Sequence, residues 1–158
     1  MDIDDEPVNA GEAVDSVQLA QALASAVTLV KDRFPAVTVN LNPWRDDPQT
    51  RRWHEDQTLD LAFHFPGWSP RLECRSLLLQ LHLQRRSADG ESLPTPHLLG
   101  VLMRGMTYDG ERWRLVTMGD WHPEGSHLPQ PEQVQQLHAI CRGLFDLFAN
   151  PAATGTAA

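Results

Sequence analysis

The sequence holds little that covalent or cofactor chemistry could use. It has only two cysteines, Cys74 and Cys141, and their ordinary surroundings predict two buried free thiols in a reducing compartment. No glycine-rich phosphate loop and no GxSxG, HExxH or CxxC motif is present. We therefore expect a cytoplasmic protein without a bound cofactor, and the balance of these features leans against an enzyme.

Long apolar runs are also missing, and so is an excess of positive charge. No run approaches the 18 or more apolar residues of a membrane span, and the acidic N-terminus lacks the features of a signal peptide. The net charge is −8, and five acids within residues 1–12 supply −5 of it. The remainder is nearly balanced, which argues against a nonspecific nucleic-acid binder and predicts no membrane partner.

The length and patterning predict one folded domain with two tails. Residues 1–12 are acidic and poor in apolar groups, which predicts a disordered tail, and residues 151–158 predict a second one. Between them, residues 13–150 form one domain, for which a hydrophobic content of 41% supplies a core.

Periodicity predicts two helices and a run of strands. Apolar residues recur at helical spacing from about residue 13 to residue 34 and again from Pro131 to about residue 149. Alternating residues predict strands over 58–65 and 72–85, and a hairpin over 98–121. The fold class is therefore α+β: an antiparallel four-stranded meander, five-stranded if residues 37–41 add a strand, with both helices on one face.

The hairpin determines which side chains share a face. Asp109-Gly110 between two apolar runs predicts a two-residue loop. The resulting register is Tyr108 opposite Glu111, Met106 opposite Trp113, Arg104 opposite Leu115 and Val101 opposite Met118.

This register predicts one apolar face and one mixed face. The helices are expected to cover the apolar face, made by Leu59, Leu61, Phe63, Phe65, Leu77, Leu79, Leu81, Leu83, Val101, Met103, Val116 and Met118. The opposite face is expected to carry Leu102, Arg104, Met106, Trp113, Leu115, Thr117, Ser76, Leu78, Gln80, His82 and Gln84. A mixture with Trp, Met and Arg is typical of an interface core. Two alternatives remain open: a protein partner covers this face, or the loop 42–57, with Trp44 and Trp53, folds over it.

Two further groups of residues suggest chemistry. Asp120, His122, Glu124 and His127 lie within eight residues and are all possible metal ligands, although their spacing matches no metal motif. His54, Glu55 and Asp56 could form an acid–base pair with His64 or His82.

The leading hypothesis is a non-catalytic protein-binding, assembly or chaperone-like module that binds a protein partner or a second copy of itself. Its predicted binding residues are Trp113, Arg104, Met106, Leu115, His82, Gln80, Trp44 and Trp53. The alternative is a small-molecule or metal-dependent enzyme with its site between this face and the loop 42–57. A third hypothesis is single-stranded nucleic-acid binding, based on neighbouring Arg and Trp residues.

Overall fold

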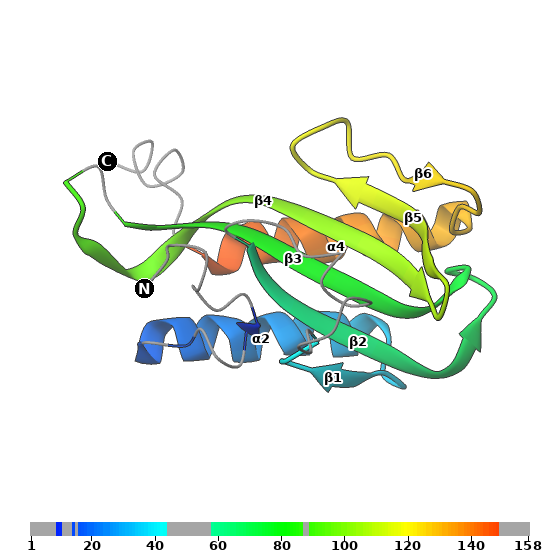
Figure 1. The fold of residues 1–158 in the computed structure, drawn as a ribbon, viewed down its shortest axis with the longest axis horizontal. Helices are drawn as coiled ribbons and strands as arrows, with labels where there is room; N and C mark the ends of the chain where they lie inside the picture. The colour runs from blue at the N-terminus through cyan, green and yellow to red at the C-terminus, as the bar shows by residue number, and fades with distance from the viewer. Residues whose placement is uncertain (1–8, 11–13, 15, 44–57, 87–88, 149–158) are drawn as a thin grey trace.

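The chain folds into two layers, a six-stranded antiparallel sheet and a pair of helices that lie against one of its faces (Figure 1). The computed structural model describes residues 9, 10, 14, 16–43, 58–86 and 89–148. The strands are adjacent in the order in which they follow along the chain, from β1 to β6. The predicted α+β class and the antiparallel meander are confirmed.

Two helices form the second layer. Helix α2 spans Val17–Arg33 and begins where the Ser16 side chain accepts a hydrogen bond from the backbone N–H of Leu19, at 3.1 Å. Helix α4 spans Pro131–Leu147, with proline in the first turn, where a missing N–H costs nothing. Both elements match the predicted helices within a few residues at each end.

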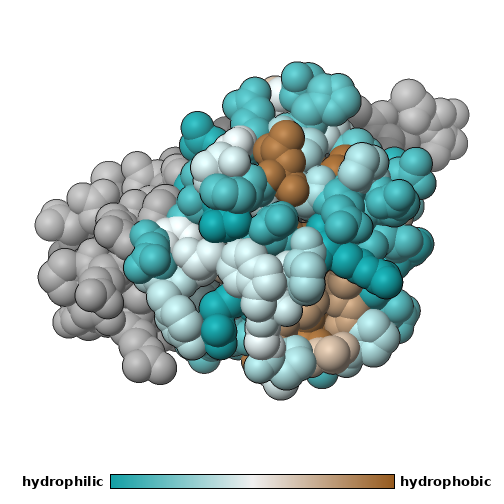
Figure 2. Space-filling model, turned by 90° about the vertical axis from the view of Figure 1, so that its right-hand side faces the viewer, coloured by the Kyte–Doolittle hydropathy of each residue, from teal (hydrophilic) through white to brown (hydrophobic). Residues whose placement is uncertain are grey.

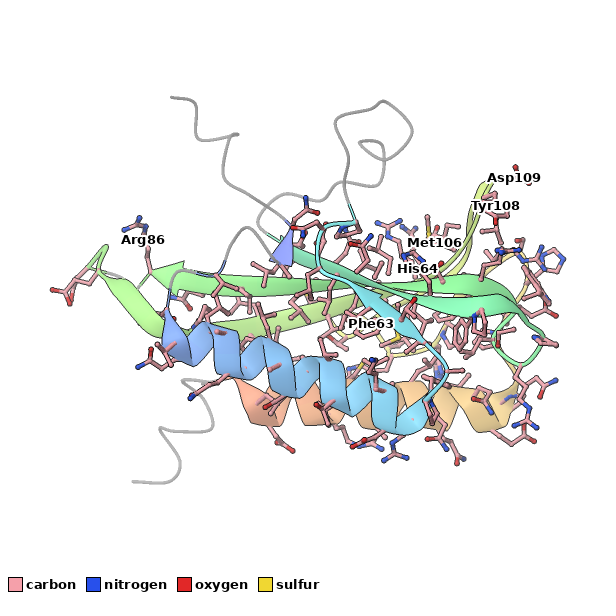
Figure 3. All side chains as sticks on the ribbon, turned by 90° about the horizontal axis from the view of Figure 1, so that it is seen from below. Phe63, His64, Arg86, Met106, Tyr108 and Asp109 are labelled. Atoms are coloured by element: carbon pink, nitrogen blue, oxygen red, sulfur yellow. The ribbon has the colours of Figure 1, made fainter. Side chains whose placement is uncertain are left out.

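The helices pack closely because one residue at their contact has no side chain. A Cβ placed on Gly143 of α4 would lie 2.9 Å from a methyl carbon of Leu29 on α2. The Arg33 guanidinium also donates a hydrogen bond of 2.8 Å to the Gln136 side-chain oxygen. These contacts hold the two helices as one layer over the sheet (Figure 3).

The six strands vary greatly in length. Their bounds are β1 Thr38–Asn40, β2 Thr58–Ser69, β3 Cys74–Arg86, β4 Ser92–Thr107, β5 Gly110–Val116 and β6 Glu124–Gly125. The leucine alternation in residues 72–85 therefore does mark a strand, as predicted. The count of four or five strands was wrong because β6 is only two residues long, too short for any periodicity to reveal.

Apolar side chains between the two layers form the core. The strands contribute alternate residues to it, which are Leu59, Leu61, Phe63, Leu77, Leu79, Leu81, Leu83, Leu98, Val101, Met103, Trp113 and Leu115. The helices contribute Leu19, Ala22, Leu23, Ala26, Val30, Leu137, Ile140, Cys141 and Leu144, and Phe148 joins them from the C-cap of α4. Burial of this many apolar side chains is the main source of stability for a domain of this size. Within the described residues, no helix combines the length and apolar character that a membrane span requires.

Candidate functional site

The sheet face turned away from α2 and α4, here called the outer face, carries only part of the predicted set. Gln80 and His82 of β3 and Arg104 and Met106 of β4 all lie on this face, as predicted. Gln80 and Arg104 are buried, whereas His82 and Met106 are partly exposed. Trp44 and Trp53, and the loop 42–57 beyond residue 43, lie outside the described residues.

Trp113 was assigned to the wrong face. It is fully buried in the core between sheet and helices, and its indole Nε1–H donates a hydrogen bond of 2.6 Å to the carbonyl of Leu72. It pairs with Gly105, and a Cβ on Gly105 would collide with the indole ring. The ring therefore lies over a glycine, which is the one residue type that leaves room for it.

A one-residue shift in the hairpin explains this error. Thr107 pairs with Gly110, so the two-residue loop is Tyr108-Asp109 rather than Asp109-Gly110. Met106 then pairs with Glu111 but Gly105 pairs with Trp113, which leaves Arg112 as an extra bulge residue. Because side chains alternate across a strand, this bulge turns every later residue of β5 to the opposite face.

The shift corrects three other placements. Leu115 pairs with Met103 and is buried in the core, so it is not available on the outer face. Val116 pairs with Leu102, on the outer face. Met118 packs against Gly100 and is 57% exposed, so neither Val116 nor Met118 belongs to the helix-covered face.

A chain of four polar side chains, three of them buried, crosses the centre of the outer face. The Gln80 amide donates a hydrogen bond of 3.2 Å to the Asp60 carboxylate. Arg104 donates through Nε to the Gln80 oxygen at 3.0 Å and through Nη1 to the Glu111 carboxylate at 3.1 Å. Asp60 and Gln80 are fully buried and Arg104 is 4% exposed. We call these four residues, one from each of β2 to β5, the polar row.

The polar row constrains the outer face energetically. A buried guanidinium is costly unless its donors are paired, and here it joins an amide oxygen and a carboxylate. These partners meet in one strand register only, so a slipped strand would leave charges unpaired. The sequence alternation correctly placed Gln80 and Arg104 on one face, but it could not show that their side chains pair with each other.

Beyond the polar row, the outer face becomes exposed near the β4–β5 hairpin. Tyr108, at the tip of this hairpin, is 82% exposed, and the Arg75 guanidinium lies 4.4 Å from the centre of its ring. His64, Ser76 and Met106 occupy paired positions on three adjacent strands. Figure 3 shows His64, Met106 and Tyr108 on the side of the sheet away from the helices. We call these five residues the hairpin-end surface.

One pair in this surface resembles a nucleophile and its base, but its setting does not favour catalysis. The Ser76 hydroxyl lies 2.7 Å from Nδ1 of His64. Burial lowers the pKa of His64, because desolvation disfavours the imidazolium. Ser76 is paired with strands on both sides, so nearby backbone N–H groups lie in the sheet plane, where they cannot stabilise an oxyanion above the face. The predicted partners His54, Glu55 and Asp56 lie outside the described residues.

The thiols are buried and poorly suited to nucleophilic chemistry. Cys74 and Cys141 are both free and buried. Desolvation raises the pKa of each thiol to about 12, so neither forms a thiolate near neutral pH. The prediction of two buried free thiols is confirmed.

The four candidate metal ligands lie on the exposed stretch of chain between β5 and α4 and do not form a metal-binding group. Asp120, His122, Glu124 and His127 are all exposed. The Asp120 carboxylate accepts a hydrogen bond of 3.1 Å from the backbone N–H of His122, and Glu124 belongs to β6. Among the described residues, no group of three or more potential ligands is arranged to hold a metal ion.

These observations define a small α+β domain whose meander sheet has one helix-covered face and one face with a buried polar row and an exposed hairpin end. Residues 11–150 match a family described as a domain of unknown function, and the chain belongs to that family. No curated protein and no solved structure matches the chain.

Proposed function

We propose that this protein is a non-catalytic protein-binding module, of an assembly or chaperone-like kind, which contacts its partner through the hairpin-end surface. The observation that carries the proposal is Tyr108, which is 82% exposed and stacked with Arg75 at the tip of a hairpin. Tyrosine and arginine are enriched among the residues that dominate binding energy at interfaces. Met106 on the same surface adds an adaptable apolar side chain.

The scaffold beneath this surface supports the proposal. Arg104 and Glu111 of the polar row lie on β4 and β5, the two strands that carry the hairpin. Trp113 holds the base of β5 against the β2–β3 turn through its hydrogen bond to Leu72. Because these two interactions fix the strands that carry the hairpin, the hairpin-end surface loses little conformational freedom on binding. More of the energy of its contacts then appears as affinity.

The surroundings of the hairpin favour a mixed, moderately polar contact. Figure 2 looks onto the end of the molecule that carries the β2–β3 turn, and the surface there is largely hydrophilic with separate apolar patches. Trp68, which is 44% exposed, lies near this turn, and the Arg112 guanidinium is 5.0 Å from its ring centre. Interfaces between proteins that also exist separately have this composition, whereas permanent interfaces are more apolar.

The test compares Tyr108→Ser with Leu128→Ser, a matched change at a residue that is 50% exposed on the β6–α4 connection. Sedimentation velocity over a range of concentrations measures self-association. We expect wild type and Leu128→Ser to associate equally and Tyr108→Ser to remain monomeric.

A second arm tests a different protein as the partner. A photo-crosslinking amino acid is placed at position 108 or at position 128 of the full chain in cells. The proposal expects a protein that is crosslinked from position 108 only and that binds the purified wild type more tightly than Tyr108→Ser. A chain that stays monomeric and yields no crosslink specific to position 108 would overturn the proposal.

A further inference from the structure

An open cleft lies at the end of the molecule where α2 ends, α4 begins and β2 turns into β3 (Figure 1). Its volume is about 660 Å³, within the range of sites that hold small organic molecules. Its lining includes Arg33 of α2, Arg71 of the β2–β3 turn and Gln133 of α4, so three elements meet there. None of these residues belongs to the hairpin-end surface or to the polar row, so neither of those groups accounts for the cleft.

Hydrogen bonds join the elements that surround this cleft. The backbone N–H of Gln130, at the N-cap of α4, donates a hydrogen bond of 2.9 Å to the carbonyl of Arg71 in the β2–β3 turn. The Arg33 guanidinium donates to the Gln136 side-chain oxygen at 2.8 Å, which joins α2 to α4. Because the surrounding elements are tied to one another, the cleft exists before any ligand arrives, as ligand sites usually do.

The two arginines of the cleft lack acidic partners. Within the described residues, Arg104 and Arg112 each form an ion pair with a glutamate, whereas Arg33 and Arg71 form none. A planar guanidinium with unused donors binds carboxylate or phosphate oxygens. Asp32 also lines the cleft. Two guanidinium groups and one carboxylate leave one net positive charge, which suits a monoanion better than a ligand with several negative charges.

Apolar side chains form another part of the lining. Leu72 is 1% exposed, and Leu29 and Phe34 are half-buried. The Phe34 ring packs edge-on against the ring of Phe65, with the ring centres 5.9 Å apart. Apolar groups beside a few polar ones are typical of small-molecule sites, in which burial of the ligand body supplies affinity and the polar groups orient it. An inorganic anion would leave this apolar part of the cleft unused.

We infer that this cleft binds a small organic monoanion, an apolar carboxylic acid whose carboxylate pairs with Arg33 and Arg71 and whose body packs on the apolar part of the lining. Ser69 adds a further donor, because its oxygen accepts a hydrogen bond of 3.4 Å from the Leu72 N–H and its own proton is left for the ligand. This site goes beyond the proposed protein-binding function and does not depend on it.

The first experiment tests the ligand class. The full chain is titrated with octanoate and with 3-phenylpropanoate, and the backbone amides are followed by NMR. We expect both acids to shift amides within residues 33–34, 69–72 and 133–136 in a saturable way. Acetate, which lacks the apolar body, and octylammonium, which reverses the charge, should bind at least about tenfold more weakly than octanoate. No saturable shift at the cleft with either acid, or equal binding of acetate or octylammonium, would overturn the site.

The second experiment removes positive charge from the cleft. Arg33→Gln and Arg71→Gln should each weaken octanoate binding about two- to fivefold, the size expected for an exposed charge pair. Arg142→Gln, at an exposed position of α4 outside the lining, is the matched control and should bind as wild type does. Within the described residues the Arg71 side chain has no partner, so Arg71→Gln tests the site even if Arg33→Gln, which loses the contact with Gln136, alters the fold.

The opposite change of charge should produce a gain of affinity, which structural damage cannot imitate. Asp32→Asn removes a negative charge from the lining and should tighten octanoate binding about two- to fivefold, whereas Asp146→Asn, an exposed position of α4 outside the lining, should have no effect. Unchanged affinity in both Arg71→Gln and Asp32→Asn would show nonspecific apolar adsorption and would overturn the site. Tyr108→Ser should bind octanoate as wild type does, so failure here is distinguishable from failure of the hairpin-end surface.

Discussion

The two faces of this sheet differ in the chemistry of their buried central side chains. The helix-covered face places Leu61, Phe63 and Leu79 in an apolar core at 0–1% exposure. On the outer face Asp60 and Gln80 are equally inaccessible, but they are polar and are satisfied by hydrogen bonds within the polar row. An apolar face is stabilised in any register that excludes water from it, whereas the hydrogen bonds of a polar row form in one register only. We conclude that the first face supplies stability and the second fixes how the strands, and the hairpin they carry, are aligned.

The largest loss of stability is expected on the helix-covered face. Phe63→Ala removes a fully buried ring, and the lost transfer free energy plus the cavity should lower the free energy of unfolding by about 3–5 kcal/mol. Urea denaturation measures the change. Val17→Ala, at a position 69% exposed, is the control and should change little. A loss below about 1 kcal/mol for Phe63→Ala would mean that this face is not the main source of stability.

Disrupting the polar row should lower the free energy of unfolding somewhat less than Phe63→Ala does. Arg104→Met keeps much of the side-chain volume but leaves the partners of the guanidinium in a poorly solvated place. Because Glu111 is 21% exposed and can recover some solvent, we expect a loss of about 2–3 kcal/mol in unfolding free energy. A double-mutant cycle with Glu111→Gln isolates the pair, and strictly additive losses would show that the two side chains do not interact.

Replacement of Gly105, the glycine opposite Trp113, is expected to have the next largest effect on stability. In Gly105→Ala the new methyl group would occupy the place of the indole ring, so the ring must move and its hydrogen bond to Leu72 must lengthen. Overpacking of this kind costs about 1–3 kcal/mol. The near-ultraviolet circular dichroism of the tryptophans should change as well, and an unchanged spectrum with unchanged stability would contradict the account.

The helix-covered face was predictable because its signal extends over many residues. Leu77, Leu79, Leu81 and Leu83 alternate over a whole strand, and period-2 alternation has no other simple explanation. The helices were predictable for the same reason, and both begin at residues with clear physical roles, Ser16 and Pro131. A periodic hydrophobic pattern still predicts the correct element when one of its positions is misassigned.

The face of Trp113 was not predictable, because one bulge residue decides it. Either loop, Asp109-Gly110 or Tyr108-Asp109, would by itself leave Trp113 on the outer face, and only the extra residue Arg112, between the pairs Met106–Glu111 and Gly105–Trp113, turns it into the core. One signal could have helped: a shifted register places Trp113 over Gly105, a favourable aromatic–glycine pair, whereas the predicted register leaves that glycine without a partner ring. The pairing of side chains in the polar row depends on three-dimensional proximity and has no local pattern.

The smallest expected effect on stability near neutral pH is that of the two thiols. Burial raises the pKa of Cys74 and Cys141 to about 12 from the ordinary thiol value of 9.0, so the folded state keeps protons that the unfolded chain releases between these values. Stability should therefore be unaffected near pH 7 and should fall as the pH rises above about 9. With a thiol-reactive chromogenic reagent near neutral pH, native protein should react slowly and denatured protein at both cysteines. Rapid reaction of the native protein would contradict the burial of these residues.

The most direct test of a division of labour between the faces is to measure stability and association on the same two variants. Phe63→Ala should lower the melting temperature while its folded fraction still associates, and Tyr108→Ser should melt like wild type but lose association in sedimentation velocity. Unchanged association in Tyr108→Ser, together with loss of association in folded Phe63→Ala, would contradict the account.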